Sequence, residues 1–275
     1  MTRRGLAFAG FTLVELVMVI ALAGLVAVMI GSVLNRPMQG FVDQSRRAEL
    51  VDLAAIALNQ MARDIRLAVP NSVRKGVSGE IEMLRAPVGG RYRANLVNEL
   101  RHNPPICPVA PCDIPVLGPL RLDDLDLRQP LWMVIYPTGQ RSNGFNVWSS
   151  ADEGASVIAP RTRIERTSEG LRLMSVEAFR FRSGSPQHRF FLADKVIGYR
   201  CVGGRILRGE FDSLEPSYDY AGAAVVAANV DCVNSAFTYD EGTNTRNGLV
   251  TIRLRLTKDG ETISLLQQVH VDNAP

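Results

Sequence analysis

The chain has 275 residues, of which 46% are apolar, and its 31 Lys and Arg residues against 28 Asp and Glu residues give a net charge of +3. This apolar content is normal for a packed core and excludes a disordered chain, and the length allows one large domain or two small ones. The basic residues are scattered rather than massed in one block, which argues against a dedicated nucleic-acid-binding protein.

The first predicted element is an apolar segment over residues 11–34, with a single carboxylate, Glu15, near its start. As an α-helix it would be about 36 Å long, enough to cross a hydrocarbon core of about 30 Å. Arg3 and Arg4 precede it, as at the basic start of an export signal. A carboxylate in the middle of a membrane is unfavourable by about 2.5 to 3.5 kcal/mol, so Glu15 needs a partner or a shallow depth.

A cleaved secretory signal is the alternative interpretation of this segment. It would be cut after the triplet Ala21-Leu22-Ala23, so that the mature chain would start at Gly24. Two features oppose it: the apolar run continues for eleven residues beyond Ala23, and Glu15 would weaken the membrane insertion of a short apolar signal region. We therefore favour a membrane anchor that the protein keeps.

The sequence Gly10-Phe11-Thr12-Leu13-Val14-Glu15 resembles the cleavage and methylation motif of type IV prepilins, a family that includes type IV pilus subunits and the pseudopilins of type II secretion. The resemblance implies a leader over residues 1–10, cleavage after Gly10 by a membrane-embedded prepilin peptidase, and N-methylation of Phe11. It also implies that residues 11–34 form the transmembrane and filament-core helix. Glycine before the cut suits such cleavage, because it has no side chain to obstruct an extended backbone in a protease cleft.

The same resemblance implies roles for Glu15 and Thr12 in filament assembly. In such filaments the amine of an incoming subunit is thought to meet the glutamate of a neighbour, so that both charges are neutralised among packed helices. The implied partners are other pilin subunits, the prepilin peptidase and the inner-membrane pilus assembly platform, with no nucleic acid. The alternative for Glu15 is that its carboxylate only reaches the membrane surface, since it lies within two turns of the segment's start.

Residues 35–69 are predicted to form an amphipathic helix. We expect Pro37 to interrupt the helix after the anchor and Pro70-Asn71 to end it, although the resemblance implies one long helix, half anchor and half scaffold, with a bend near Pro37. An apolar stripe recurs at spacings of three and four, while Asp64 and other polar residues lie largely off it. The stripe consists of Leu50, Ala54, Ala57, Leu58, Met61, Ile65 and Ala68.

From Pro70 onward the apolar period changes to two, which predicts an α+β head domain over residues 70–275, with a mostly antiparallel sheet beside the helix. Residues 249–256 alternate, and the turn Lys258-Asp259-Gly260-Glu261 leads into residues 262–271, which predicts a hairpin. The other predicted strands are 79–84, 132–136, 161–166, 176–182, 195–202 and 205–211. Residues 91–131 and 214–247 are expected to be rich in loops.

Four cysteines follow the anchor, and an even number there predicts disulfides in an oxidising periplasm. They allow three pairings, of which we favour the one with the shortest loops, Cys107 with Cys112 and Cys201 with Cys232. A zinc site is the alternative, but the paired ligand spacing of a zinc knuckle is absent. The head is therefore expected in the periplasm, on a protein that crosses the inner membrane once and later becomes part of a filament at the cell surface.

No motif predicts a catalytic residue, a cofactor or a resident metal, so we expect a protein that is not an enzyme. The histidines are dispersed, and none has a neighbouring nucleophile. Two acidic loops carry oxygen ligands that suit calcium, but without EF-hand spacing, and solvated turns are the simpler interpretation. These loops are Asp123-Asp124-Leu125-Asp126 and Asp240-Glu241 with Asn244 and Asn247.

Within the family, three stretches resemble the minor pilin of the mannose-sensitive haemagglutinin (MSHA) pilus system, which implies a low-copy subunit in pilus biogenesis and cell adhesion. They are residues 41–52 (FVDQSRRAELVD), 61–73 (MARDIRLAVPNSV) and 190–201 (FFLADKVIGYRC). The alternative is a minor, J-like pseudopilin of a type II secretion system. Two hypotheses of other classes are a membrane-tethered binding module that never joins a filament and a soluble periplasmic enzyme.

Overall fold

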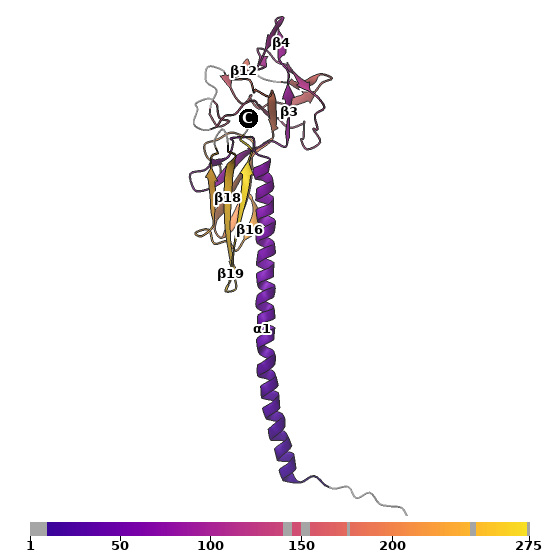
Figure 1. Ribbon diagram of the computed structural model, residues 1–275, viewed down its shortest axis with the longest axis vertical. Helices are drawn as coiled ribbons and strands as arrows, with labels where there is room; N and C mark the ends of the chain where they lie inside the picture. Colours follow the sequence, from indigo (N-terminus) through magenta and orange to yellow (C-terminus); the bar gives the residue numbers. More distant parts are fainter. Residues whose placement is uncertain (1–9, 140–144, 150–154, 175–176, 243–245, 274–275) are drawn as a thin grey trace, which may run out of the picture. The chain divides into compact units, whose positions relative to one another are not determined.

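The structure is a computed structural model that describes residues 10–139, 145–149, 155–174, 177–242 and 246–273; within these, the side chains of residues 32–39 and 42 are not described. The chain divides into two compact units, Met1–Glu49 and Leu50–Pro275. One helix, α1 (Leu13–Arg66), contributes residues to both units (Figure 1).

In the first unit, α1 carries an apolar stretch, Leu13–Gly31, that is long enough and apolar enough to cross a membrane. None of this stretch is buried, and its large apolar side chains are between 50% and 79% exposed. Because an apolar surface of this size is unfavourable in water, the stretch requires cover by lipid or by other apolar helices.

The expected interruption at Pro37 is wrong, because α1 continues through this position without a break. A proline inside a helix removes one backbone hydrogen bond, and its ring crowds the carbonyl four residues earlier. Together these effects are unfavourable by about 3 kcal/mol, but they do not end α1 here. Residues on both sides of Pro37 therefore belong to one helix.

The helix ends at Arg66, a few residues before the expected end, because the chain there begins to pair with β2 (Ile81–Arg85). The backbone N–H of Val69 donates to the carbonyl of Leu84, and that of Ala86 donates to the carbonyl of Leu67. These sheet-like hydrogen bonds replace the helical ones before Pro70 is reached.

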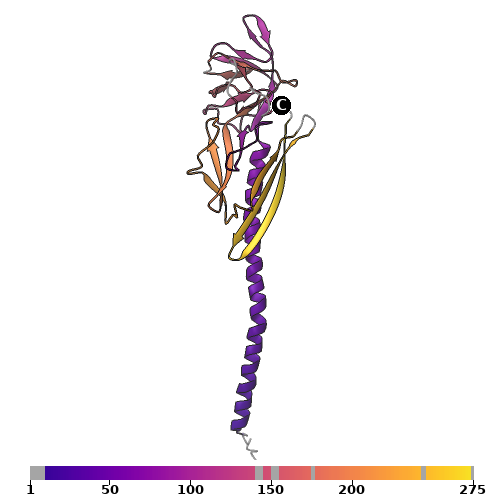
Figure 2. The same ribbon diagram turned by 90° about the vertical axis from the view of Figure 1, so that its left-hand side faces the viewer.

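The second unit builds a helix-on-sheet core. Six of the seven residues of the predicted apolar stripe are buried there, and Ala68 is partly buried against them. They pack on a five-stranded sheet and a three-stranded sheet that flank this part of α1 in Figure 2. The first sheet has the order β1 (Arg74–Lys75), β2, β14 (Lys195–Val202), β15 (Arg205–Phe211) and β16 (Ala224–Ala228); the second has the order β17 (Ala236–Asp240), β18 (Gly248–Lys258) and β19 (Glu261–Val271).

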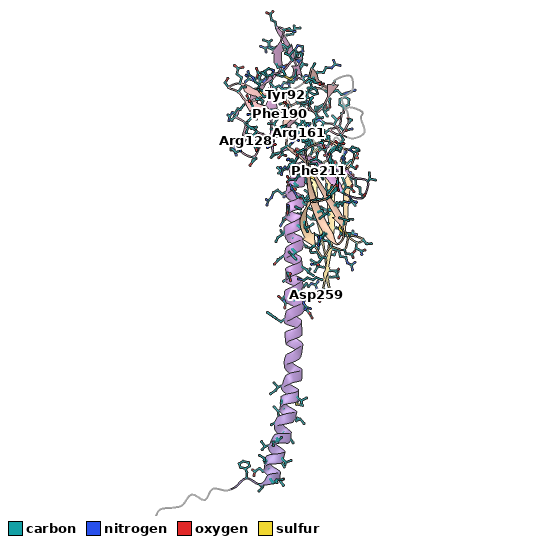
Figure 3. All side chains as sticks on the ribbon, turned by 180° about the vertical axis from the view of Figure 1, so that it is seen from behind. Tyr92, Arg128, Arg161, Phe190, Phe211 and Asp259 are labelled. Carbon is teal, nitrogen blue, oxygen red and sulfur yellow. A yellow bond between two sulfur atoms is a disulfide. The ribbon has the colours of Figure 1, made fainter. Side chains whose placement is uncertain are left out.

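Between β2 and β14 the chain leaves the first sheet and builds a second layer of structure, residues 88–193, which we call the inserted lobe. It has a core cluster of its own, with Tyr92 and Phe190 among the largest fully buried side chains (Figure 3). A further cluster packs Trp132 of the lobe with Leu84 and Val196 of the first sheet. Its main sheet has the order β10 (Ile164–Arg166), β11 (Gly170–Leu173), β7 (Cys112–Leu117), β3 (Val88–Tyr92), β13 (Arg189–Ala193) and β8 (Trp132–Val134). The smaller sheets are β6 (Ile106–Cys107), β12 (Phe179–Phe181) and β9 (Ala155–Ser156), and the hairpin β4 (Asn95–Val97) with β5 (Leu100–His102).

The predicted α+β class is confirmed as an N-terminal apolar helix with a mostly antiparallel β domain, in which β12 with β9 is the one parallel pair among the described strands. The predicted C-terminal hairpin is confirmed by continuous pairing from Gly248↔Val271 to Lys258↔Glu261, and Asp259 lies in its turn (Figure 3). β14 and β15 have the predicted bounds, and β2, β8, β10 and β12 overlap predicted strands. Residue 176, at the start of the predicted 176–182 strand, lies outside the described residues.

The expectation of loop-rich segments is partly wrong, because β4 to β7 lie within residues 91–131, and β16 and β17 lie within residues 214–247. The prolines conceal β7, which contains Pro115 and still pairs with strands on both sides. In β16 the sequence AVVAA has no alternation of apolar and polar residues, so periodicity does not identify it as a strand.

Candidate functional site

The N-terminal segment contains the residues to which the sequence assigned processing and assembly. Gly10 and Phe11 precede the helix and have no regular secondary structure. The Phe11 side chain is 76% exposed, and no atom outside the adjoining residues lies within 4 Å of where a Cβ would stand on Gly10. The peptide bond between them is therefore accessible to an enzyme. Residues 1–9 of the predicted leader, with Arg3 and Arg4, lie outside the described residues.

Thr12 is the N-cap of α1, and the structure brings it together with Glu15. The backbone N–H of Glu15 donates to the Thr12 hydroxyl (3.3 Å) and to the Thr12 carbonyl (3.1 Å). A threonine at the N-cap followed three positions later by glutamate is the capping-box pattern, and a carboxylate in the first turn is favoured by the helix dipole. Both residues thus have a local role at the helix start, which the sequence reasoning did not assign to them.

The Glu15 carboxylate itself has no ion pair or side-chain hydrogen bond among the described residues, and the residue is exposed. It is the one acidic or basic residue between Phe11 and Gly31. A charge in an apolar stretch that requires cover must be neutralised or kept near water when that cover forms. The arrangement therefore leaves this carboxylate available to a partner outside the chain.

Both favoured disulfides are confirmed. Cys107 is bonded to Cys112 across a Cα–Cα distance of 5.4 Å, and Cys201 is bonded to Cys232 across 5.5 Å. All four cysteines of the chain are used, so the alternative of a zinc site with thiolate ligands is wrong. The second disulfide ties the end of β14 to the segment between β16 and β17, and thereby joins the two sheets of the helix-on-sheet core.

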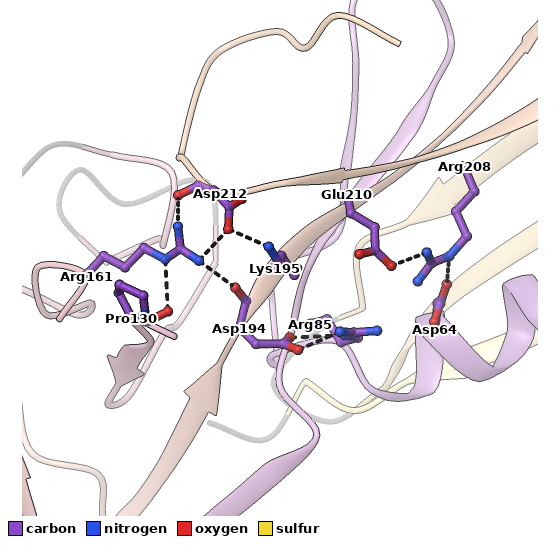
Figure 4. A network of polar contacts seen from close by, with 9 residues as sticks. All are labelled: Asp64, Arg85, Pro130, Arg161, Asp194, Lys195, Arg208, Glu210 and Asp212. Atoms are coloured by element: carbon purple, nitrogen blue, oxygen red, sulfur yellow. Dashed lines mark hydrogen bonds and ion pairs between the residues drawn. The ribbon is translucent and has the colours of Figure 1, made fainter. Parts of the chain in front are cut away.

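A polar network at the base of the inserted lobe was missed by the sequence reasoning (Figure 4). Arg85, at the end of β2, donates from two nitrogens to the Asp194 carboxylate, at 3.0 Å and 2.5 Å. Arg161 of the lobe donates to the carbonyl of Asp194 and to both the carbonyl and the carboxylate of Asp212, and the Lys195 ammonium also contacts the Asp212 carboxylate. These side chains hold the lobe on the first sheet.

A second group of buried polar residues lies between α1 and β14 to β15. The Asp64 carboxylate, expected to lie off the apolar stripe, is only 6% exposed and accepts hydrogen bonds from the Tyr199 hydroxyl (2.6 Å) and the Arg208 Nε (2.7 Å). Burial together with the Asp64 charge raises the pKa of Tyr199. Burial opposes the charge of Arg208, but the hydrogen bonds of Asp64 and Glu210 outweigh it and raise the Arg208 pKa. These hydrogen bonds therefore fix the position of α1 on β14 and β15.

Glu82 forms a third buried polar contact, with Arg74. The Glu82 side chain has no exposure, and the Arg74 Nε lies 2.7 Å from its carboxylate. The Arg74 guanidinium also lies over the ring of Trp148, 3.7 Å from its centroid. Burial raises the pKa of Glu82 although Arg74 opposes the shift, so the ionised form of this carboxyl is less favourable here than in water.

The residues that suit calcium in principle are not gathered into a metal site in the described part of the chain, where no three His, Cys, Asp or Glu side chains converge. The Asp126 carboxylate accepts hydrogen bonds from the backbone and side chain of Arg128, and the Asp240 carboxylate pairs with Arg246. Asn244 lies outside the described residues.

Comparison with known proteins returns no match: no protein-family model, no curated protein and no solved structure is similar to this chain. A function for this protein therefore has to be inferred from its residues, above all from the exposed start of α1.

Proposed function

We propose that this protein is a minor subunit of a type IV filament of the MSHA pilus type, cut by a prepilin peptidase after Gly10 and assembled through its N-terminal helix. The observation that carries the proposal is the combination at the start of α1. An accessible Gly10–Phe11 bond is followed at once by an exposed apolar helix whose one carboxylate, Glu15, has no partner among the described residues.

The rest of the chain supports this proposal. A helix whose C-terminal part packs on an antiparallel sheet is the arrangement that the pilin resemblance implies, and we propose that the fold is pilin-like. Two disulfides fit a head domain in the periplasm, since structural disulfides persist in oxidising compartments. The subunit would enter the inner membrane once through α1, and would leave it as the filament grows.

The unpartnered carboxylate gives assembly a physical reason. In lipid alone the Glu15 charge is unfavourable by about 2.5 to 3.5 kcal/mol, whereas the amine freed at Phe11 of another subunit supplies the opposite charge. Pairing of this carboxylate with that amine inside a bundle of apolar helices neutralises both charges, and it sets the axial position of one subunit against the next.

The decisive measurement is the mass of the N-terminal peptide of the protein isolated from its own cells. We expect a peptide that starts at Phe11 and carries one extra methyl group on its amine. A mature chain that starts at Gly24 would support a secretory signal instead, and an uncut chain would contradict processing. In a matched variant, Gly10→Leu, the precursor should remain uncut in the membrane, because a bulky side chain obstructs the bond that the exposed segment otherwise presents.

A further inference from the structure

The inserted lobe is not needed to complete the core around α1. The helix, the five-stranded sheet and the β17–β19 sheet bury one another's apolar side chains without a described residue of the lobe. The lobe has a core cluster of its own, beside a smaller cluster that it shares with Leu84 and Val196 of the five-stranded sheet. Because a helix-on-sheet core does not require residues 88–193, this lobe is a natural carrier of recognition, and a groove on its surface is a candidate binding site.

Such a groove lies where the ends of β3 and β7 meet the turn between β10 and β11. Its volume is about 440 Å³, within the range of small-molecule sites. Its lining includes Arg93, Val116, Arg166, Ser168, Glu169 and Gly170. A smaller hollow of about 190 Å³ adjoins the same turn and contains the ion pair of Arg172 with Asp113.

The wall of the groove is held firmly. The Gly170 N–H donates to the Thr167 hydroxyl (3.0 Å), and the Val116 N–H of β7 donates to the Glu169 carbonyl (2.9 Å). A Cβ on Gly170 would stand 2.2 Å from the Ile114 carbonyl oxygen, so only glycine allows the turn to approach β7 this closely. The groove is thus preformed rather than a gap in a loose loop.

The charges that line the groove are predominantly positive. Arg93 and Arg166 are exposed, and neither has an ion pair in the part of the chain that the structure describes, whereas Arg172 across the turn is paired with Asp113. Glu169 is the one carboxylate in the lining, and the hydroxyl of Ser168 adds a donor without a partner among the described residues. Arg93 and Arg166 both line this groove, and an arginine guanidinium can bind an oxyanion through two parallel N–H donors.

We propose that this groove binds the oxyanion group of a small ligand, a carboxylate, sulfate or phosphate, and that Arg93 and Arg166 are the residues that recognise it. This site is independent of the filament function, because it lies on the inserted lobe and uses no residue of α1. Glu169 limits the affinity for a bare anion and offers an acceptor to a hydroxyl group that the ligand carries beside its charge.

The test is saturation-transfer NMR on the full-length protein in a non-ionic detergent, with glucuronate as the charged probe and glucose as its neutral counterpart. We expect saturation transfer to glucuronate and none to glucose. The double variant Arg93→Gln/Arg166→Gln should weaken glucuronate binding by about tenfold or more, because two charge-assisted contacts are lost. Glu169→Gln should strengthen it, since a repelling carboxylate is removed.

Arg253→Gln is the matched control, because Arg253 is an exposed arginine of β18 without an ion pair among the described residues. It should bind glucuronate as the native chain does, and all variants should keep the native melting temperature. Competition then identifies the source of the oxyanion: displacement by sulfate and acetate at equal concentration indicates a small free anion, and resistance to both indicates a charged saccharide. The proposal would be overturned if the double variant transferred saturation to glucuronate as strongly as the native protein does, or if the native protein transferred none.

Discussion

Arg85 and Asp194 form a two-point ion pair at the position where the chain leaves the five-stranded sheet and where it returns. The guanidinium donates at 3.0 Å and 2.5 Å to the two carboxylate oxygens, and the side chains are only 24% and 18% exposed. The hydrogen bond with Asp194 raises the pKa of Arg85, although burial opposes the shift. This pair closes the base of the inserted lobe (Figure 4).

Asp194→Ala is expected to lower the free energy of unfolding by about 2 to 3 kcal/mol, because it leaves a half-buried guanidinium without its partner. Asp113→Ala is the control, since Arg172 also pairs with Asp113 through two nitrogens, but at 42% and 56% exposure. The loss there should be much smaller, because water screens an exposed pair. Urea unfolding followed by tryptophan fluorescence measures both, and equal losses would show that the burial of the pair is without effect.

Thr12 and Glu15 allow the local role of the capping box to be separated from the proposed role in assembly. Thr12→Ala removes the cap and keeps the charge; it should cost about 1 kcal/mol of helix stability and lower incorporation less than the loss of the charge does. Glu15→Gln keeps a capping-box residue and removes the charge, and should lower incorporation about tenfold. The measurement is the amount of the subunit in sheared filaments, with N-terminal cleavage checked in both variants. If Thr12→Ala were as defective as Glu15→Gln, the capping box alone would explain the motif.

The buried Glu82 carboxyl makes stability depend on pH in a defined direction. Its pKa in the folded chain is raised above the ordinary value of 4.5, mainly by burial, so the folded chain binds more protons at this site than the unfolded chain. Its contribution to stability is therefore present below pH 4.5 and is lost as the pH rises through the folded pKa. Glu82→Gln should thus gain stability relative to the native chain as the pH rises from about 4 to about 7.

Chemical denaturation at several pH values measures this difference. Asp126→Asn is the matched control, because backbone and side-chain hydrogen bonds from Arg128 lower the pKa of Asp126 on the surface. A carboxyl group with a lowered pKa stabilises the folded chain at pH values above its unfolded pKa, and this stabilisation is lost only in more acidic solution. The free energy of unfolding of Asp126→Asn should therefore differ from that of the native chain by a constant amount from about pH 5 to pH 7. A constant difference for Glu82→Gln as well would mean that burial does not raise the pKa of this carboxyl.

The two disulfides should differ in their effect on stability. In the chain-entropy account, closing the loop from Cys201 to Cys232, separated by 31 positions, is worth about 3.7 kcal/mol, and closing Cys107 to Cys112, separated by 5, is worth about 2 kcal/mol. Cys201→Ser/Cys232→Ser should therefore lower the melting temperature more than Cys107→Ser/Cys112→Ser. The opposite order would mean that the short loop supports the lobe through packing that the long one lacks.

The predictable parts of the fold are those in which a single segment carries its own pattern. The stripe from Leu50 to Ile65 identifies the helix face because its spacing matches the helical period, and β18 with β19 is recognisable from strict alternation around Asp259-Gly260. The favoured disulfides follow from sequence distance. β7 contains a proline and pairs with strands that are distant in the chain, so its own sequence does not identify it as a strand. β16 pairs with the preceding strand, β15, but its uniform small apolar residues carry no alternating pattern.

The candidate site shows the same division. Gly10, Phe11 and Glu15 are adjacent in sequence, so their register can be read without a structure, and the capping contact of Thr12 lies in a pattern of four residues. Asp64 is the opposite case, because a carboxylate beside an apolar stripe is expected in water. It is buried only because Tyr199 and Arg208 come to it from two strands more than a hundred residues away.

The sequence by itself determined the apolar helix, its lone carboxylate, the amphipathic face that follows and the α+β class, because each depends on periodicity or composition within one segment. Only the tertiary structure decided that residues 88–193 form a lobe inserted between β2 and β14, that Arg85, Arg161 and Asp194 fasten it, and that Arg93 and Arg166 share one groove. Long-range strand pairing and the burial of charged side chains depend on which distant segments come into contact, and local sequence patterns do not predict those contacts.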